Sequence, residues 1–281
     1  MDILPLCAEV PFKAGDIIKQ TYQLQQQLGT GAYGVIFSAL YTNGATTKHV
    51  AIKIEKNLPQ FTLQANEVFI MKAMENCKHF AKFYQCGTHE DYKFVAMELL
   101  GPSLIQLANR HHPCRLNLHD LIKFGIQAVE SLKELHKAGF VHRDVKPDNF
   151  VIGNQQNTTG FIYLIDFGLF KKINKENGVI VKPLQPSSFR GTLRYASPNA
   201  HKRIELGRSD DIISLFYLMI ELFIGKLPWS SDIVLQQKLI YRGGELTCLN
   251  HLIGKMKQMN KDTLQFKNSL KFQSKEGKIR K

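Results

Sequence analysis

The sequence lacks any apolar run of about 18 residues or more, the length that a membrane-spanning helix requires. Its longest apolar stretch, residues 212–224, is interrupted by Ser214 and Glu221 and is too short to span a bilayer. The N-terminus has an apolar patch at Ile3–Leu6, but it has neither a preceding basic region nor the core of a signal peptide. We therefore expect a buried helix at 212–224, no membrane association, and a location in the cytoplasm or the nucleus.

Cysteine is scarce, and none of the five cysteines shows the Cys-x-x-Cys spacing of a metal site. An odd number of cysteines without that spacing argues against a disulfide framework and against structural zinc. The expected state is the reduced thiol, as in most proteins of the cytosol and nucleus, for Cys7, Cys77, Cys86, Cys114 and Cys248.

The basic regions lack interleaved aromatic side chains and any recognisable nucleic-acid-binding module. Residues 251–281 supply +7 of the formal net charge of +13, through eight lysines and one arginine against Asp262 and Glu276. A solvated tail is the ordinary explanation of such a run. Nucleic-acid binding is not expected; deleting the tail and measuring the salt dependence of RNA or DNA binding would detect it.

The most informative feature that is present is residues 142–149, His-Arg-Asp-Val-Lys-Pro-Asp-Asn, followed by Asp166-Phe167-Gly168. The first stretch places Asp144, Lys146 and Asn149 within six residues. Phosphoryl transfer from ATP needs a carboxylate to orient the hydroxyl, a cation to balance charge, and an amide and a second carboxylate to hold Mg²⁺. Either motif alone would be a plain surface turn. In this order they resemble the protein kinase set.

The first hundred residues favour β-strands. A strand at 22–28 runs into Gly29-Thr30-Gly31-Ala32-Tyr33-Gly34-Val35, and Asn43-Gly44 predicts a hairpin before a strand at 49–54. A Gly-x-Gly-x-x-Gly motif alone is weak, because it also marks dinucleotide-binding folds, where it opens a helix. More strand residues follow it here, which favours a flexible lid over phosphates.

A helix is predicted at 61–74, where Val68, Met71 and Met74 share one face. It carries Glu67, which we expect to form an ion pair with Lys53 on the preceding strand. In isolation, two such residues would more often be surface charges, and the rest of the kinase set is what favours the pair.

The chain then turns from strand to helix. Residues 94–97 predict a strand, and residues 98–102 a hinge whose backbone can bind adenine. Residues 118–135 predict a helix with Asn117 as N-cap and Gly139 just past its end. We interpret its apolar positions as core, namely Leu118, Leu121, Ile122, Ile126, Val129, Leu132 and Leu135. A further helix at 211–224 is apolar on nearly all sides, as is typical at the centre of a lobe.

Three stretches resemble the casein kinase I superfamily: residues 97–104, residues 189–197 and Asn199-Ala200-His201. Most other kinases carry Ala-Pro-Glu where this chain has Ser-Pro-Asn. The superfamily pattern there is Ser-Ile-Asn, so Pro198 is a departure. The resemblance covers about residues 20–230.

Within the superfamily, the chain is similar to the tau-tubulin kinase branch. The similarity lies in Asp210-Asp211 followed by residues 214–217, in Gly139-Phe140 before the catalytic loop, and in residues 225–229. Lys146 directly before Pro147 resembles the serine/threonine-kinase version of the loop.

The resemblance implies a role for each matching residue. Asp144 would be the base, Lys146 would balance the γ-phosphate, Asn149 and Asp166 would bind Mg²⁺, and Thr192 would brace Asp144 and Lys146. Met97 would be the gatekeeper. ATP would be bound by Leu28, Gly29, Gly31, Gly34, Val35, Ala51, Lys53, Met97, Glu98 and Leu100.

The activation segment, residues 166–198, is basic, which predicts attraction of acidic or phosphorylated protein substrates. The resemblance implies that Arg194, helped by Arg190 and Lys182, binds an anion near the substrate. For Arg194, a purely structural role in the segment is an equal alternative.

These observations predict one α+β protein kinase domain over residues 1–281. It would have a β-rich N-lobe at about 15–98, a hinge at 98–102, a mainly helical C-lobe at 103–243, and a basic divergent tail at 244–281. A helix is expected at 233–241 and a short one within 246–259, but the two further apolar helices of a full C-lobe are not recognisable. The expected activity is serine/threonine phosphorylation with Mg-ATP. The alternative is a weakly active or inactive kinase-fold scaffold with an incomplete C-lobe.

Overall fold

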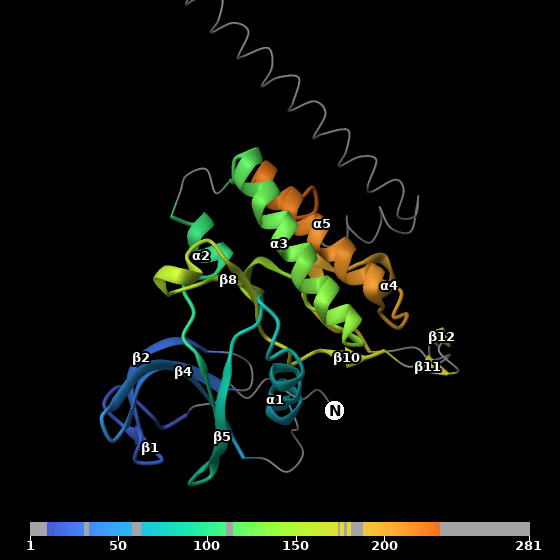
Figure 1. The fold of residues 1–281 in the computed structure, drawn as a ribbon. Helices are drawn as coiled ribbons and strands as arrows, with labels where there is room; N and C mark the ends of the chain where they lie inside the picture. Colours follow the sequence, from blue (N-terminus) through green and yellow to red (C-terminus); the bar gives the residue numbers. More distant parts are fainter. Residues whose placement is uncertain are drawn as a thin grey trace, which may run out of the picture.

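The computed structural model describes residues 10–30, 34–57, 63–110, 115–173, 175–176, 179–180 and 188–230. Within them the chain forms two lobes, a curled antiparallel sheet with one helix and a mainly helical lobe (Figure 1). This confirms the predicted two-lobed α+β fold. The predicted helix at 233–241, the segment 246–259 and the basic tail lie outside the described residues.

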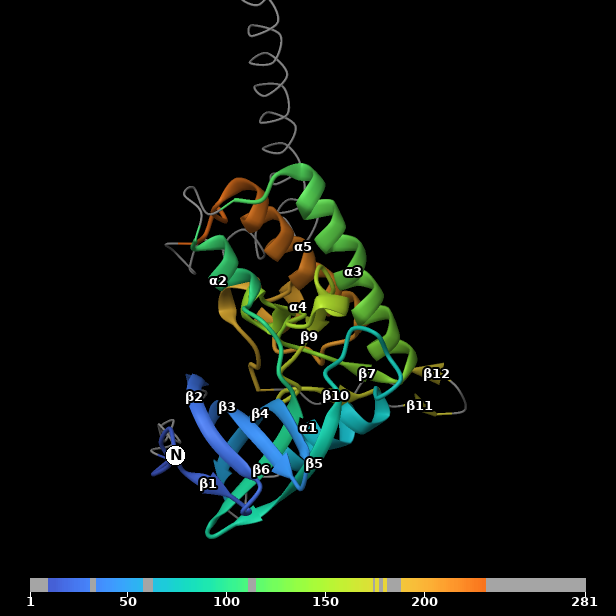
Figure 2. The same ribbon diagram turned by 60° about the vertical axis from the view of Figure 1, so that its left-hand side comes forward.

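The first lobe is a six-stranded sheet in the order β1-β2-β3-β4-β6-β5. Its elements are β1 (Ile17–Ile18), β2 (Tyr22–Thr30), β3 (Gly34–Asn43), β4 (Thr46–Lys56), β5 (Phe83–His89) and β6 (Tyr92–Glu98). The predicted hairpin is present, because Asn43 pairs with Thr46 across a turn in which Gly44 has a φ of 57°. Helix α1 (Leu63–Ala73) packs beside β5 and β6 (Figure 2).

The second lobe is built on α3 (Leu118–Lys137) and α5 (Arg208–Ile224), which lie side by side in both ribbon views (Figures 1 and 2). Its other elements are α2 (Leu104–Ala108), β7 (Phe140–Val141), β8 (Phe150–Ile152), β9 (Ile162–Leu164), β10 (Lys171–Lys172), β11 (Lys175–Glu176), β12 (Val179–Ile180) and α4 (Pro198–His201). Short 3-10 turns lie at Pro147–Asn149, Gln156–Thr158 and Leu193–Tyr195.

The ends of α3 are as predicted. The side chain of Asn117 accepts a hydrogen bond of 2.9 Å from the backbone N–H of Asp120. At the other end Ala138 is the C-cap, and Gly139 follows with a φ of 89°, in the left-handed region that glycine adopts without strain.

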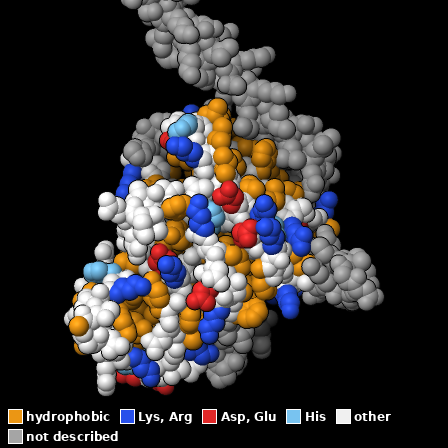
Figure 3. All heavy atoms as spheres, in the orientation of Figure 1, with side chains coloured by type: hydrophobic (Ala, Val, Ile, Leu, Met, Phe, Trp, Pro, Cys, Tyr) orange, Lys and Arg blue, Asp and Glu red, His pale blue; other side chains and the backbone are white. Residues whose placement is uncertain are grey.

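The interpretation of the whole apolar stripe of α3 as core was wrong for four of its residues. Leu121, Leu132 and Leu135 are buried, but a second set is 46–56% exposed: Leu118, Ile122, Ile126 and Val129. The helix packs on one side against α5 and β9, and the stripe is wider than the side that these neighbours cover. Hydrophobic side chains accordingly show over the upper part of α3 on the surface (Figure 3).

Helix α5 carries the centre of the second lobe. Leu215, Tyr217, Leu218, Ile220 and Leu222 are buried, as its sequence predicts, while Ile212 is exposed. The first turn buries two carboxylates, and Gly225 ends the helix with a φ of 90°.

None of the helices in the described part of the chain is long and apolar enough to cross a membrane. Cys77 and Cys86 are not in a disulfide.

Candidate active site

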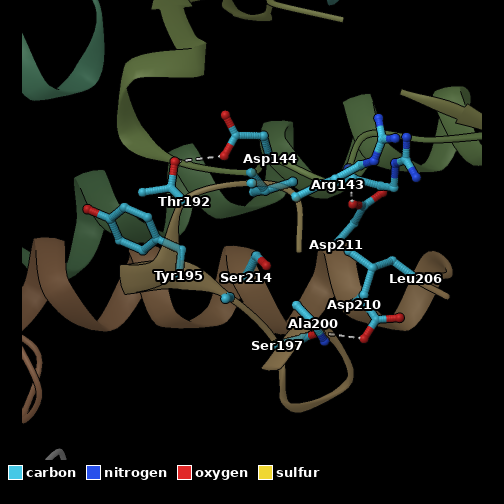
Figure 4. A pocket seen from close by; sticks show the side chains of 14 residues that line it. Arg143, Asp144, Thr192, Tyr195, Ser197, Ala200, Leu206, Asp210, Asp211 and Ser214 are labelled. Atoms are coloured by element: carbon cyan, nitrogen blue, oxygen red, sulfur yellow. Dashed lines mark hydrogen bonds between the residues drawn. The ribbon is translucent and has the colours of Figure 1, made fainter. Parts of the chain in front are cut away.

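The centre of the site is the carboxylate of Asp144, in the loop between β7 and β8. Thr192 Oγ1 donates a hydrogen bond of 2.8 Å to its Oδ1 (Figure 4). Lys146 Nζ lies 2.7 Å from its Oδ2. Asn149 Nδ2 donates a hydrogen bond of 2.8 Å to the Asp144 carbonyl. The structure therefore brings together four residues that the sequence proposed for one site. They come from the loop and from a segment 48 residues further along the chain.

Asp211 of α5 holds this loop in place. Its two carboxylate oxygens accept hydrogen bonds of 2.9 Å from the backbone N–H groups of His142 and Arg143, and His136 Nε2 contacts it at 2.7 Å. Arg143 has a φ of 68°, a strained conformation for a residue with a side chain, and the buried carboxylate offsets its cost. The sequence pointed to Asp211 only as part of a family motif, not as an anchor.

His142 joins the loop to the segment that carries Asp166. Its Nδ1 accepts a hydrogen bond of 3.3 Å from the Asp144 N–H, so its Nε2 is the protonated nitrogen and donates one of 3.1 Å to the Ile165 carbonyl. The next residue, Asp166, is exposed and has a φ of 64°. Phe167 is buried and stacks on Phe80 of the first lobe, with ring centroids 5.8 Å apart. Asp166 is therefore presented to solvent from a fixed backbone.

Lys53 of β4 reaches the site from the first lobe. Its Nζ lies 2.6 Å from Glu67 Oε2, so the predicted ion pair is present, and 3.3 Å from Glu55 Oε1. Burial disfavours its charge, but the two carboxylates and Asp166 together raise the pKa of Lys53 above its usual value. Glu55 was not among the residues predicted for the site. Its spacing from Lys53 could have indicated it, because residues two apart on a strand point to the same face.

The pKa of Lys146, in the second lobe, is set by the same two opposing effects. Burial opposes its charge, and Asp144 and Asp166 raise its pKa. Asp166 thus acts electrostatically on a lysine from each lobe. The two lysines and the carboxylates of Asp144 and Asp166 therefore form one charged cluster.

The glycine-rich stretch lies on β2 and β3, where Gly29 pairs with Ile36. A Cβ on Gly34 would lie 2.4 Å from the Ile54 carbonyl oxygen, so only glycine fits there. A Cβ on Gly29 would meet no atom within 4 Å, which leaves the backbone open to a ligand. Gly31 lies outside the described residues.

The residues predicted to surround adenine lie on neighbouring strands. Ala51 of β4 pairs with Met97 of β6, Val35 and Ala51 are buried, and Leu28 is exposed. Glu98 is buried and accepts a hydrogen bond of 3.2 Å from the Lys82 N–H, while Leu100 packs partly buried near Met97.

Of the residues predicted to bind an anion, the two described arginines have different surroundings. Arg194 Nη1 lies 3.3 Å from Glu221 Oε1 of α5, and the Tyr195 hydroxyl donates a hydrogen bond to the same carboxylate. Arg190 instead lines a pocket beneath the catalytic loop with Arg143. Lys182 lies outside the described residues.

Comparisons with known proteins identify the family of this chain. The sequence model of the protein kinase domain matches residues 22–275. A Dictyostelium discoideum protein named as a serine/threonine-protein kinase is 39% identical over 220 residues, which are 78% of this chain and 44% of that protein. A Caenorhabditis elegans protein named as a casein kinase I is 30% identical over 218 residues, 76% of this chain and 63% of that protein. The chain thus spans less than two thirds of either relative.

Proposed function

Because this chain belongs to the protein kinase domain family, we propose that it transfers the γ-phosphoryl group of Mg-ATP to serine or threonine hydroxyls of proteins. The observation that carries the proposal is the Asp144 carboxylate held between Thr192 and Lys146. Within the family we place the chain in the casein kinase I superfamily, near the tau-tubulin kinase branch. Support for that placement is the set of motifs at 97–104, 189–197 and 210–217 and the similarity to the C. elegans protein.

In this proposal the residues act by position and charge. Within the described residues each oxygen of Asp144 has one polar partner, which leaves a lone pair to orient the substrate hydroxyl and accept its proton. The hydroxyl oxygen bonds to the γ-phosphorus as the bond to the β-phosphate oxygen breaks, and ADP leaves. Lys146 balances the charge of the transferred group, and Lys53, held by Glu67, faces the remaining phosphates.

The donor set suits Mg²⁺, which binds oxygen ligands and keeps few protein partners beside substrate phosphates. Asp166 and Asn149 would hold it. Asn149 uses its amide nitrogen on the Asp144 carbonyl, so its amide oxygen is the atom available to a cation. Bound there, Mg²⁺ would supply positive charge to the phosphates.

Acidic or already phosphorylated proteins are the proposed substrates. The support is charge: the described part of the activation segment presents Lys171, Lys172, Arg190 and Arg194 beside the catalytic loop, and Arg190 and Arg194 are exposed. Opposite charge on a substrate would speed its association.

The test is an ATP-dependent phosphorylation assay of the purified chain on casein and on an acidic peptide. We expect phosphate incorporation that Asp144→Asn and Lys53→Met each nearly abolish while circular dichroism stays unchanged. Asp166→Asn should shift the Mg²⁺ requirement to higher concentrations. Wild-type turnover in Asp144→Asn would contradict the proposal. Nucleotide binding without transfer in the wild-type chain would favour the alternative of a kinase-fold scaffold.

A further inference from the structure

Glu205 is a buried carboxylate between α4 and α5 that the proposed mechanism does not use. It is 9% exposed, its Oε2 lies 2.7 Å from Lys171 Nζ, and its Oε1 lies 3.6 Å from Arg143 Nη1. Its two partners belong to different parts of the site. Arg143 directly precedes Asp144, and Lys171 is in β10, a few residues beyond Asp166. One carboxylate therefore links the catalytic loop to the start of the activation segment.

Arg143 makes this link rigid. Its Nε donates a hydrogen bond of 2.7 Å to the Leu169 carbonyl, and its Nη2 donates one of 3.3 Å to the Phe170 carbonyl. The guanidinium thus fixes the backbone that follows Asp166-Phe167-Gly168. Its side chain is only 9% exposed, so its charge requires a counter-ion.

The positive charge of Arg190 increases the need of Arg143 for a counter-ion. Burial, and then the positive charge of Arg190, lower the pKa of Arg143, while Glu205 and, after it, Asp211 oppose both. Arg143 and Leu206, the residue after Glu205, line the same pocket on the side away from Thr192 (Figure 4). Without Glu205, Arg143 and Lys171 would be left without their shared carboxylate, with Arg190 close by.

The contact between Glu205 and Arg143 is an ion pair without a hydrogen bond, while the contact with Lys171 is close. Among the residues that the structure describes, Oε1 of Glu205 has no hydrogen-bond partner, and its distance to Arg143 exceeds that of a hydrogen bond. A free anion that carries at least as much charge could therefore take its place. In many kinases a cluster of this kind is neutralised by a phosphate added to the activation segment, which orders that segment through arginine contacts.

We propose that Glu205 is a positioning residue, a built-in counter-ion for Arg143 and Lys171 that holds the catalytic loop and activation segment in the transfer-competent arrangement without an added phosphate. This inference rests on the proposed kinase function. Glu205 would neutralise the cations that a phosphorylated residue of the activation segment neutralises in other kinases.

The test is replacement of Glu205 followed by rescue with sulfate. Glu205→Ala should lower kcat about 10- to 100-fold, because the loop is displaced, with the KM for ATP changed by less than about twofold. Sulfate should then restore kcat several-fold, relative to chloride at equal ionic strength. Glu205→Asp should keep most activity. Glu205→Gln should lose activity without rescue, because its amide fills the space without charge.

A second measurement needs no activity and so separates this inference from the proposed function. In the Asp144→Asn background, sulfate should raise the Tm of Glu205→Ala more than that of the Glu205 parent, since sulfate also stabilises proteins generally. Adding Lys171→Ala to Glu205→Ala should remove the excess. The inference is overturned by wild-type kcat in Glu205→Ala, by a sulfate response equal to that of the parent, or by an excess that survives Lys171→Ala. If Glu205→Ala does not fold, Glu205→Gln decides alone, and wild-type kcat in it overturns the inference.

Discussion

Thr192 and Asp144 are joined by a hydrogen bond of 2.8 Å in which the threonine hydroxyl donates to the carboxylate. Thr192 opens the turn before α4, so the bond ties the activation segment to the catalytic loop. Lys146 contacts the other oxygen of the same carboxylate. The orientation of Asp144 therefore depends on a residue that lies far from it in the chain.

Replacing Thr192 by valine, which has nearly the same shape, should lower kcat. Loss of a hydrogen bond to a charged group costs about 1.5–3 kcal/mol, which corresponds to about a 10- to 100-fold fall in rate if it is felt in the transition state. The KM for ATP should change little. Thr192→Ser keeps the hydroxyl and should keep most of the activity, so equal rates for the valine and serine variants would contradict a role for the hydrogen bond.

The two described glycines of the glycine-rich stretch should differ in their tolerance of alanine. In Gly34→Ala the new Cβ would lie 2.4 Å from the Ile54 carbonyl oxygen and 2.6 Å from Glu55 Cγ, so the strands must separate. We expect a loss of about 1–3 kcal/mol in the free energy of unfolding. Gly29→Ala meets no atom within 4 Å and should stay within about 0.5 kcal/mol. Urea unfolding measures both, and equal stabilities would show that the sheet can yield at Gly34.

Glu55 should make the stability of the protein depend on pH. Burial is the main cause that raises its pKa above the usual 4.5, with Lys53 only partly opposing it. An acid whose pKa is raised by folding adds stability below the unfolded value, and that stability is lost as the pH rises through the folded value. In Glu55→Gln the amide does not ionise, so stability is not lost at this position as the pH rises. The variant should be more stable than the wild type near about pH 8, and the difference should shrink as the pH falls toward 4.5.

Unfolding by urea at a series of pH values tests this prediction, with Glu67→Gln as the matched control. That control removes the 2.6 Å ion pair of Lys53 and should destabilise the protein near about pH 8. A Glu55→Gln variant that is less stable than the wild type at every pH would show that Glu55 is a required partner of Lys53.

Arg194 provides a test of substrate choice. Its side chain is 47% exposed and shares Glu221 with Tyr195, so one side of the guanidinium remains open to a phosphate. We expect Arg194→Ala to lower kcat/KM for a phosphoprimed peptide more than for the same peptide without the phosphate. Arg194→Lys, which keeps the charge but not the fork, should fall between the two.

Equal losses on both peptides would assign Arg194 to the structure of the activation segment instead. Glu221→Gln distinguishes the two roles from the other side. It frees the arginine from its ion pair, and the preference for the primed peptide should then increase.

The sequence by itself determined the features that depend on neighbours in the chain. The spacing of Asp144, Lys146 and Asn149 defines one loop, Asn43-Gly44 directs a hairpin, and Asn117 caps α3. Each follows from local backbone geometry and from hydrogen bonds between residues a few positions apart. The strands on either side of the glycine-rich stretch were predicted for the same reason, because strand residues precede and follow it directly.

The tertiary structure alone decided what depends on contacts between distant segments. Asp211 reaches back 68 and 69 residues to hold the catalytic loop, Glu205 closes the ion pairs of Arg143 and Lys171, and Arg194 meets Glu221. The apolar stripe of α3 made the same point for packing, because periodicity shows which residues share a face but not how much of that face the neighbouring elements cover. Burial and the partner of a charge are properties of the assembled lobes, and a pattern of residue types along one segment contains neither.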